Sequence, residues 1–133
     1  MSDYTVVKRE DAFDVMERWP GFGEMRMFTG QLGAEQSALT WRQMPEDTGG
    51  RGSYGHRHKT QEELYLVVSG EVTFKLGDDV FKAGPGTAVR IPPATLRSVH
   101  NDGPGEAEIV ICSPRVDDPE GDVEQVEGFW PSD

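Results

Sequence analysis

The most regular hydrophobic pattern in the chain is a strict alternation over residues 71–76. Val72, Phe74 and Leu76 are the apolar positions, and polar residues occupy the positions between them. Because successive side chains of a strand point to opposite faces, this pattern predicts a β-strand with one buried face. Similar short runs recur along the chain and predict further strands over residues 4–7, 25–29, 38–44, 63–68, 80–82, 87–91, 97–101 and 107–112.

Glycine, proline and aspartate separate these runs, with a new strand about every 8–12 residues. This spacing is typical of an antiparallel sandwich or barrel, so the predicted fold is all-β. In residues 38–44, Leu39, Trp41 and Gln43 share one face, and we expect Trp41 and Gln43 to line the barrel. The exception is residues 11–19, which predict a short N-terminal helical turn ending at Pro20.

The segment after Ser113 has no clear periodicity. It holds seven acidic residues and one basic residue, Arg115, so we interpret residues 113–133 as an acidic C-terminal tail. Phe129 and Trp130 are expected to pack back on the barrel or on a second subunit, because an aromatic pair in water is unfavourable. Residues 1–112 then form a single domain, with its central part at 38–112.

The composition restricts the partners and the compartment. The 133 residues suit one domain, and the net charge of −11 should repel phosphate backbones and anionic lipid, so we expect no nucleic-acid or membrane partner. The single cysteine, Cys112, lies in an apolar run and is predicted to be a buried thiol without an internal disulfide. With no long apolar stretch at the N-terminus, the expected location is cytoplasmic.

The candidate chemistry lies at His56-Arg57-His58, followed by Glu63. In an extended strand His56 and His58 project from the same face, and Glu63 begins the next predicted strand. If both strands face one interior, two nitrogens and one carboxylate converge there. Such mixed donors suit a divalent transition metal, namely iron, manganese, nickel, zinc or cobalt, and the sequence does not choose among them.

The spacing of these residues resembles the first signature motif of the cupin family. The match is Gly50-x5-His56-x-His58-x4-Glu63-x6-Gly70, and Gly86-x5-Pro92 with Asn101 resembles the second motif. The resemblance covers about residues 38–112. It implies an antiparallel jelly-roll barrel of six to eight strands, with the site inside one mouth and the chain often paired as a homodimer.

Two positions depart from the second motif. Ala94 stands where a glycine is usual, and Arg97 stands where the family's fourth metal-binding histidine would be. A guanidinium does not ligate a metal. His100 is expected to point outward as a surface or interface residue, because Arg97 and Asn101 would share the inward face.

Arg97 leaves two interpretations open. In the first, His56, His58 and Glu63 alone hold the metal, and Arg97 lies at the rim and binds an anionic group of a substrate. In the second, no metal binds, Arg97 pairs with Glu63, and the histidines line a pocket for an organic ligand. Tyr65 shares the face of Glu63 and is a candidate to line the pocket and contact the substrate.

The functional hypothesis is a metal-binding protein that acts on, or binds, a small anionic or oxygenated molecule. Oxygenation, isomerisation and decarboxylation are all open, because the fold does not select a reaction. The alternative is a non-catalytic, metal-free protein that binds a small molecule in the same pocket. Whether the protein is an enzyme is left open by the sequence.

Overall fold

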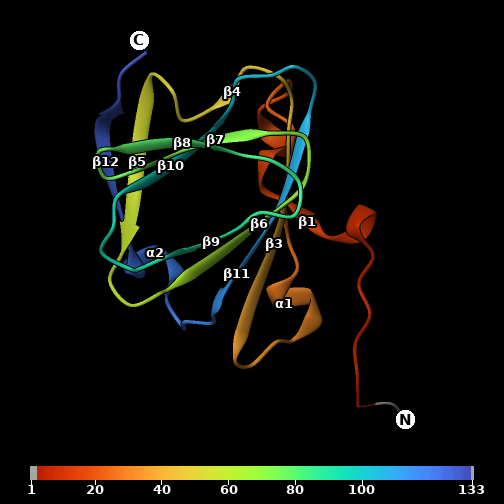
Figure 1. The fold of residues 1–133 in the computed structure, drawn as a ribbon. Coiled ribbons are helices and arrows are strands. Elements are labelled where there is room, and N and C mark those ends of the chain that lie inside the picture. The colour runs from red at the N-terminus through yellow and green to blue at the C-terminus, as the bar shows by residue number, and fades with distance from the viewer. Residues whose placement is uncertain (1–2, 133) are drawn as a thin grey trace.

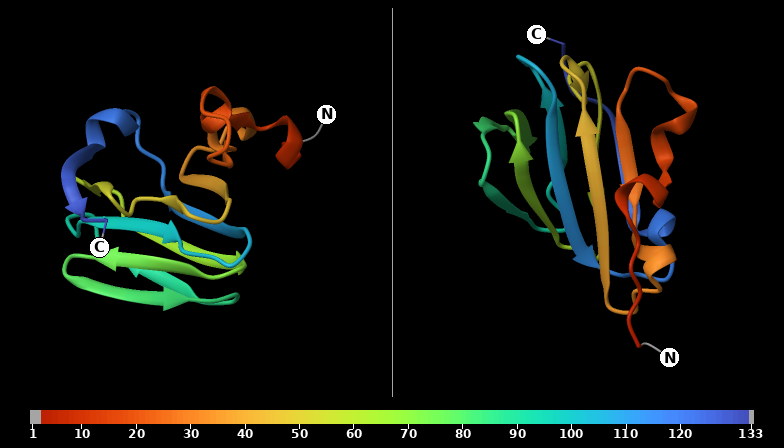
Figure 2. Two further views of the ribbon diagram at one scale, coloured as in Figure 1. Left: turned by 90° about the horizontal axis from the view of Figure 1, so that it is seen from above. Right: turned by 90° about the vertical axis from the view of Figure 1, so that its right-hand side faces the viewer.

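The structure, a computed structural model, describes residues 3–132 and consists of two antiparallel β-sheets that lie face to face (Figures 1 and 2). Four short helical segments lie between or before the strands: the 3₁₀ helices η1 (Arg9–Asp11) and η2 (Val15–Arg18), and α1 (Thr29–Leu32) and α2 (Pro119–Asp122). The strands are β1 (Phe13–Asp14), β2 (Glu24–Met27), β3 (Ser37–Met44), β4 (Thr48–Gly49), β5 (Ser53–His58), β6 (Glu63–Ser69), β7 (Val72–Leu76), β8 (Asp79–Ala83), β9 (Ala88–Ile91), β10 (Arg97–Asn101), β11 (Ala107–Pro114) and β12 (Val123–Trp130).

The first sheet has the order β1-β2-β3-β11-β6-β9, and the second has the order β12-β5-β10-β7-β8 with β4 paired to β10. Neighbouring strands are often far apart in sequence: β11 lies between β3 and β6, and β10 lies between β5 and β7. The predicted all-β, antiparallel jelly-roll fold is confirmed. The sheets form the two walls of the barrel and do not close into one continuous sheet.

The hydrophobic core fills one end of the space between the sheets. Val67 and Ile109 face inward from paired strands of the first sheet, and Phe74 and Val99 do so from paired strands of the second. The predicted alternation places each of these side chains on a buried face. Tyr65 closes the core, its ring edge-on to Phe74 at 5.6 Å. Beyond Tyr65 the inward-facing residues become polar, and the candidate site lies there.

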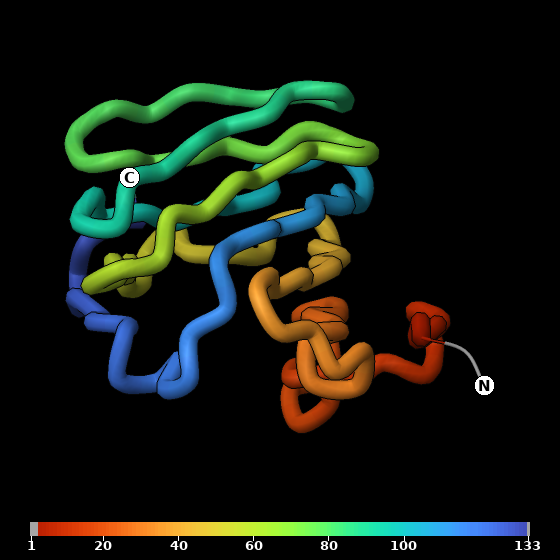
Figure 3. Tube along the Cα trace, turned by 90° about the horizontal axis from the view of Figure 1, so that it is seen from below, coloured from red at the N-terminus to blue at the C-terminus, as the bar shows by residue number. Residues whose placement is uncertain are grey.

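The N-terminal segment differs from the prediction. No strand forms over residues 4–7, where Tyr4 and Val6 are each 75% exposed and find no neighbouring strand to pair with. The helical turn is confirmed as η2, which begins where the Asp14 carboxylate accepts a hydrogen bond of 2.9 Å from the backbone N–H of Met16. Seen from below, the red N-terminal segment lies to one side of the strands (Figure 3).

The segment after Ser113, which lacks clear periodicity in the sequence, contains regular elements. β11 continues to Pro114, and α2 leads into β12, which pairs with β5 along the edge of the second sheet (Figure 1). The periodicity is weak because β12 is an edge strand with a register shift between Val126 and Trp130, and most of its polar side chains face water. Trp130 is only 4% exposed, so the predicted packing of this aromatic residue on the barrel is confirmed.

Three residues lie on the outer face of the first sheet, contrary to expectation. Cys112 is exposed because it lies opposite Leu39 and Leu64, and Leu64 is itself 48% exposed. Trp41 does not line the barrel: its Nε1 donates a hydrogen bond of 3.0 Å to Glu108, and the Arg9 guanidinium lies 5.1 Å above its ring. Gln43, on the same face, donates to Glu106.

Within residues 3–132, no helix is long and apolar enough to cross a membrane.

Candidate metal centre and ligand cavity

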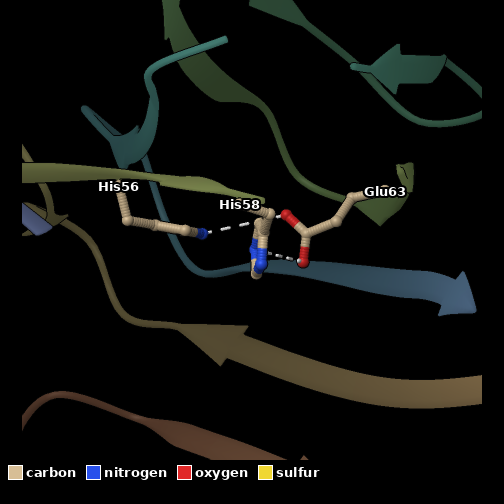
Figure 4. Close-up of side chains that lie close together, drawn as sticks. All are labelled: His56, His58 and Glu63. Carbon is tan, nitrogen blue, oxygen red and sulfur yellow. Dashed lines mark ion pairs between the residues drawn. The ribbon is translucent and has the colours of Figure 1, made fainter. Parts of the chain in front are cut away.

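Strands of opposite sheets bring the three predicted ligand residues together. His56 and His58 point inward from β5, Arg57 between them is exposed, and a four-residue connection leads to Glu63 at the start of β6. One ligand atom from each of His56, His58 and Glu63 lies within 4.8 Å of the other two. Figure 4 shows the three side chains pointing toward a common centre. The convergence expected from the strand periodicity is therefore present.

The orientation of His58 is fixed by Asp122, a residue that the sequence analysis missed. Nδ1 of His58 lies 3.2 Å from the Asp122 carboxylate, which also accepts hydrogen bonds from the backbone N–H groups of Thr60 and Gln61 and from the Thr60 hydroxyl. Burial opposes ionisation of Asp122, but these hydrogen bonds outweigh it and lower its pKa. Because an ionised carboxylate only accepts, Nδ1 of His58 carries a proton, and Nε2 is the ring atom that faces Glu63.

Nε2 of His58 is buried and has no hydrogen-bond partner among the described residues. It points at Oε2 of Glu63, 3.5 Å away. A buried polar atom without a partner is unfavourable, and such atoms are rare in folded proteins. The atom is therefore placed as a metal ligand would be.

The two oxygens of Glu63 have different surroundings. Oε1 accepts a hydrogen bond of 2.8 Å from Nη1 of Arg97 and one of 3.1 Å from the Tyr65 hydroxyl, and it lies 3.8 Å from Nε2 of His56. Within residues 3–132, Oε2 accepts no hydrogen bond. Burial alone would raise the pKa of Glu63, but His56, His58 and Arg97 together hold it well below its ordinary value, so Glu63 is a carboxylate.

Arg97 does not lie at the rim, and that expectation is wrong. The residue is 1% exposed, and its guanidinium donates to the backbone carbonyls of Pro92, Pro93 and Thr95 as well as to Glu63. The chain turns around this side chain before β10 begins, which buries it. The pair between Arg97 and Glu63 proposed in the second interpretation is present, but it occupies only one carboxylate oxygen.

Tyr65 lies beside Glu63 as predicted, with 5% of its surface exposed. Burial, and then the negative charge of Glu63, raise the pKa of its phenol, so the hydroxyl stays protonated and donates to Glu63. Its ring also lines the cavities in front of the site. A direct contact with substrate stays a prediction.

Two cavities, of about 580 and 250 Å³, open in front of these residues. The larger is lined by His56, His58 and Glu63, and the smaller continues from His56 toward Met16 and Phe22 of the N-terminal segment. The walls common to both are Met25, Arg42, His56 and Tyr65. Arg42 was missed because the neighbouring Trp41 face appeared to be the inner one. The pairing of Arg42 with Ile109, a core residue, shows that Arg42 faces inward.

His100 is neither a ligand nor a surface residue. It is 4% exposed, Nδ1 accepts a hydrogen bond of 3.2 Å from the backbone N–H of Arg51, and the ring packs edge-on to Trp130 at 6.1 Å. It does point away from the barrel interior, as predicted, but Trp130 of β12 covers it. The expectation of a surface histidine failed because it left out β12.

Comparison with known proteins found similarity in sequence and in fold. A curated relative, an uncharacterized protein of Methanocaldococcus jannaschii, is 33% identical over 58 residues, which are 44% of this chain and 46% of the relative, so the match spans about half of that protein's length. The fold resembles a sugar phosphate isomerase from a cupin superfamily of Silicibacter pomeroyi (TM-score 0.71, 12% identity, 96% of each chain). It also resembles a cupin protein of Bacteroides fragilis (TM-score 0.69, 16% identity, 88% of each chain).

A third similar structure is the polyketide cyclase RemF of Streptomyces resistomycificus, with a TM-score of 0.68, 22% identity, and coverage of 83% of this chain and 78% of that one. At such low identities the structural likeness shows the fold alone. The cupin domain family matches residues 46–113, just over half of the chain. That stretch contains His56, His58 and Glu63 and ends within β11. The chain therefore belongs to the cupin family.

Proposed function

We propose that this protein is a small metal-dependent cupin in which His56, His58 and Glu63 hold a divalent transition metal. The observation that carries the proposal is the buried Nε2 of His58, which has no hydrogen-bond partner in the described chain and faces the free oxygen of Glu63. Adjacent ligands around a cation at about 2.1 Å lie about 3.0 to 3.5 Å apart. The separation of 3.5 Å between Nε2 of His58 and Oε2 of Glu63 agrees with that range, and one ligand atom from each of the three residues lies within 4.8 Å of the others.

The surrounding residues prepare the ligands. Asp122 holds His58 in the tautomer that presents Nε2, and Arg97 and Tyr65 hold the Glu63 carboxylate by its other oxygen. A bound cation would supply Lewis acidity toward an oxygen of a small molecule in the cavity. Three protein ligands leave coordination positions for that molecule, as in two-histidine, one-carboxylate sites.

The substrate class that fits is a compact oxygenated or anionic organic molecule. Structures with this fold include proteins described as a polyketide cyclase and a sugar phosphate isomerase, and these activities differ, so the fold does not select one. A reaction therefore has to be found by assay. The predicted homodimer and the cytoplasmic location stay predictions.

A second candidate function is a metal-free receptor pocket. The observation in its favour is that His58 lies between two carboxylates, with Nδ1 3.2 Å from Asp122 and Nε2 3.5 Å from Glu63. A histidine with protons on both nitrogens would pair with both carboxylates without a metal. In that case the same cavity would bind an organic ligand without catalysing a reaction.

Metal titration separates the two candidates. The purified chain is stripped with a chelator and titrated with Co²⁺, Zn²⁺, Mn²⁺, Ni²⁺ and, without oxygen, Fe²⁺, and metal per chain is measured by elemental analysis. We expect one ion per chain, with affinity reduced at least about a hundredfold in His56→Ala. Arg57→Ala, which changes the exposed side chain between the two histidines, should bind like the wild type. A wild type that binds no more metal than His56→Ala would reject the metal site and favour the receptor pocket.

A further inference from the structure

Arg42 is the inward-facing arginine of β3 and lines both cavities. In the part of the chain that the structure describes, its guanidinium forms no ion pair and no side-chain hydrogen bond. The arginines that do form an ion pair with a carboxylate are Arg9, Arg26, Arg51, Arg57, Arg90, Arg97 and Arg115. Of the remaining two, Arg18 is exposed to water, whereas Arg42 is partly buried between the sheets.

An arginine without a partner in a cavity is costly to maintain. Burial lowers the pKa of Arg42, while the nearby Tyr65 and Tyr54 act in the opposite direction. An arginine nevertheless remains protonated in proteins, so Arg42 carries its charge and five N–H donors into the cavity. A desolvated cation with unused donors is unfavourable unless something pairs with it.

On the side of the smaller cavity, the surroundings of Arg42 suit an anion and not a cation. Among the described residues that line the smaller cavity, Arg42 is the only one with a permanent charge, and none carries a carboxylate. Ser53, Tyr54 and Ser98, each of which has a hydroxyl group, line the same cavity. The chain as a whole has a net charge of −11 and repels anions, so an anion that enters must be bound by a local positive group.

We propose that Arg42 binds an oxyanion group, a carboxylate or a phosphate, of a small molecule whose remainder extends past Tyr65 toward His56 and Glu63. The planar guanidinium matches both groups through paired hydrogen bonds. Met16, Met25 and Phe22 provide the apolar wall beside it, and the cavity volume of about 250 Å³ limits this end of the ligand to a compact group. Arg42 thus takes the role first expected of Arg97, whose donors are already used.

The part of this proposal that concerns the far end of the ligand rests on the proposed metal site, but binding of the anion to Arg42 does not. The test is therefore run on the protein as purified and again after chelator treatment. Inorganic phosphate, acetate and succinate are titrated into the ¹⁵N-labelled chain, and the shifts of backbone and arginine Nε–H resonances give the location and the dissociation constant. The phosphate and carboxylate arms identify which oxyanion the site prefers.

We expect at least one of these anions to shift resonances around Arg42, Tyr54 and Ser98. Arg42→Gln should weaken that binding about tenfold or more, and Arg42→Lys less, because a charge-assisted bidentate contact is lost. Arg18→Gln removes the same charge from an exposed arginine and should change the dissociation constant less than about twofold. Absence of any shift in the wild type, or equal weakening by Arg42→Gln and Arg18→Gln, would overturn the proposal.

The outcome is separable from that of the metal site. If Co²⁺ binds equally to wild type and Arg42→Gln while the anions bind both equally, the assignment of Arg42 fails and the metal site stands. If the wild type binds no metal but binds an anion through Arg42, the metal site fails and the assignment stands. Arg42 is not among the metal ligands, so its substitution should leave metal affinity unchanged.

Discussion

Two arginines face the interior of this barrel from opposite sheets, and their surroundings differ. Arg97 in β10 is 1% exposed and donates hydrogen bonds to Glu63 and to three backbone carbonyls. Arg42 in β3 faces the same interior and has no partner among the described side chains. The same residue type therefore serves as part of the structure in one wall and as a free donor in the other.

This difference matters for assigning function. Arg97, at the position where the cupin resemblance implies a fourth histidine, suggests an anion-binding group at the candidate metal site, but a guanidinium with its donors occupied has little left to offer a ligand. The polar residues around Glu63 and His58 form a fixed network that includes Arg97 and Asp122. The guanidinium of Arg42, in contrast, keeps its hydrogen-bond donors available for a ligand.

The largest expected effect comes from breaking the fixed network at Arg97. Arg97→Met removes one partner of a buried ion pair and leaves the Glu63 carboxylate and several carbonyls short of donors, so we expect the free energy of unfolding to fall by about 3 kcal/mol or more. Urea denaturation measures it. Arg90→Met, which breaks the exposed pair with Glu62, should cost less than about 1 kcal/mol. Similar losses in both variants would mean that Arg97 is not part of a fixed network.

Asp122→Asn tests whether the fixed network also prepares a metal ligand. An amide oxygen still accepts from His58 but lacks the charge that favours the Nε2 lone pair, and changes to such partners typically weaken metal affinity about tenfold to a hundredfold. Competition titration with Co²⁺ measures the change. Glu127→Gln removes one negative charge from an exposed position on β12, the strand that follows Asp122, and should leave the affinity unchanged. An Asp122→Asn variant with wild-type affinity would make Asp122 purely structural.

The sequence predicted the parts of this site that depend on local order. Alternation and turn residues located β6 through β11, and the extended geometry expected at His56 and His58 directed both side chains, with Glu63, toward one interior. These features follow from the period of a strand and from short connections between strands. They need no knowledge of distant segments.

The features that the sequence did not predict depend on contacts between segments that are far apart in the chain. Asp122 contacts His58 from 64 residues away, and Trp130 covers His100 from a strand without clear periodicity. Trp41 and Gln43 were assigned to the inner face of their strand, and Arg42 between them was therefore missed. Trp41 instead lies on the outer face of the sheet, where the Arg9 guanidinium covers its ring. The face of β3 that carries Trp41 is therefore not the face that lines the barrel.

The acid stability of the metal-free protein provides a smaller and more specific test of the fixed network. The pKa of Glu63 lies well below its ordinary value of 4.5 in the folded protein, so over acidic pH the unfolded chain binds a proton that the folded chain does not. The stabilisation due to the ionised Glu63 is therefore complete above about pH 5 and is lost progressively as the pH falls. We expect the stability advantage of wild type over Glu63→Gln to shrink between about pH 5 and about pH 3 in urea denaturation. A constant advantage over this range would show that the carboxylate is not held ionised by its neighbours.

The smallest expected effect is on Arg42, and its sign is opposite to that for Arg97. Arg42→Met removes a partly buried charge that has no partner in the described chain and keeps most of the side-chain volume, so we expect the unfolding free energy to rise by about 0.5 to 1 kcal/mol. Thermal unfolding in a buffer without phosphate or carboxylate should then show a Tm higher by about 2 to 4 °C. Added phosphate or succinate should stabilise the wild type and not the variant, because only the wild type retains the cation that binds them. A clear loss of stability in Arg42→Met would show that Arg42 stabilises the barrel. Arg42 and Arg97 would then have the same role and differ only in position.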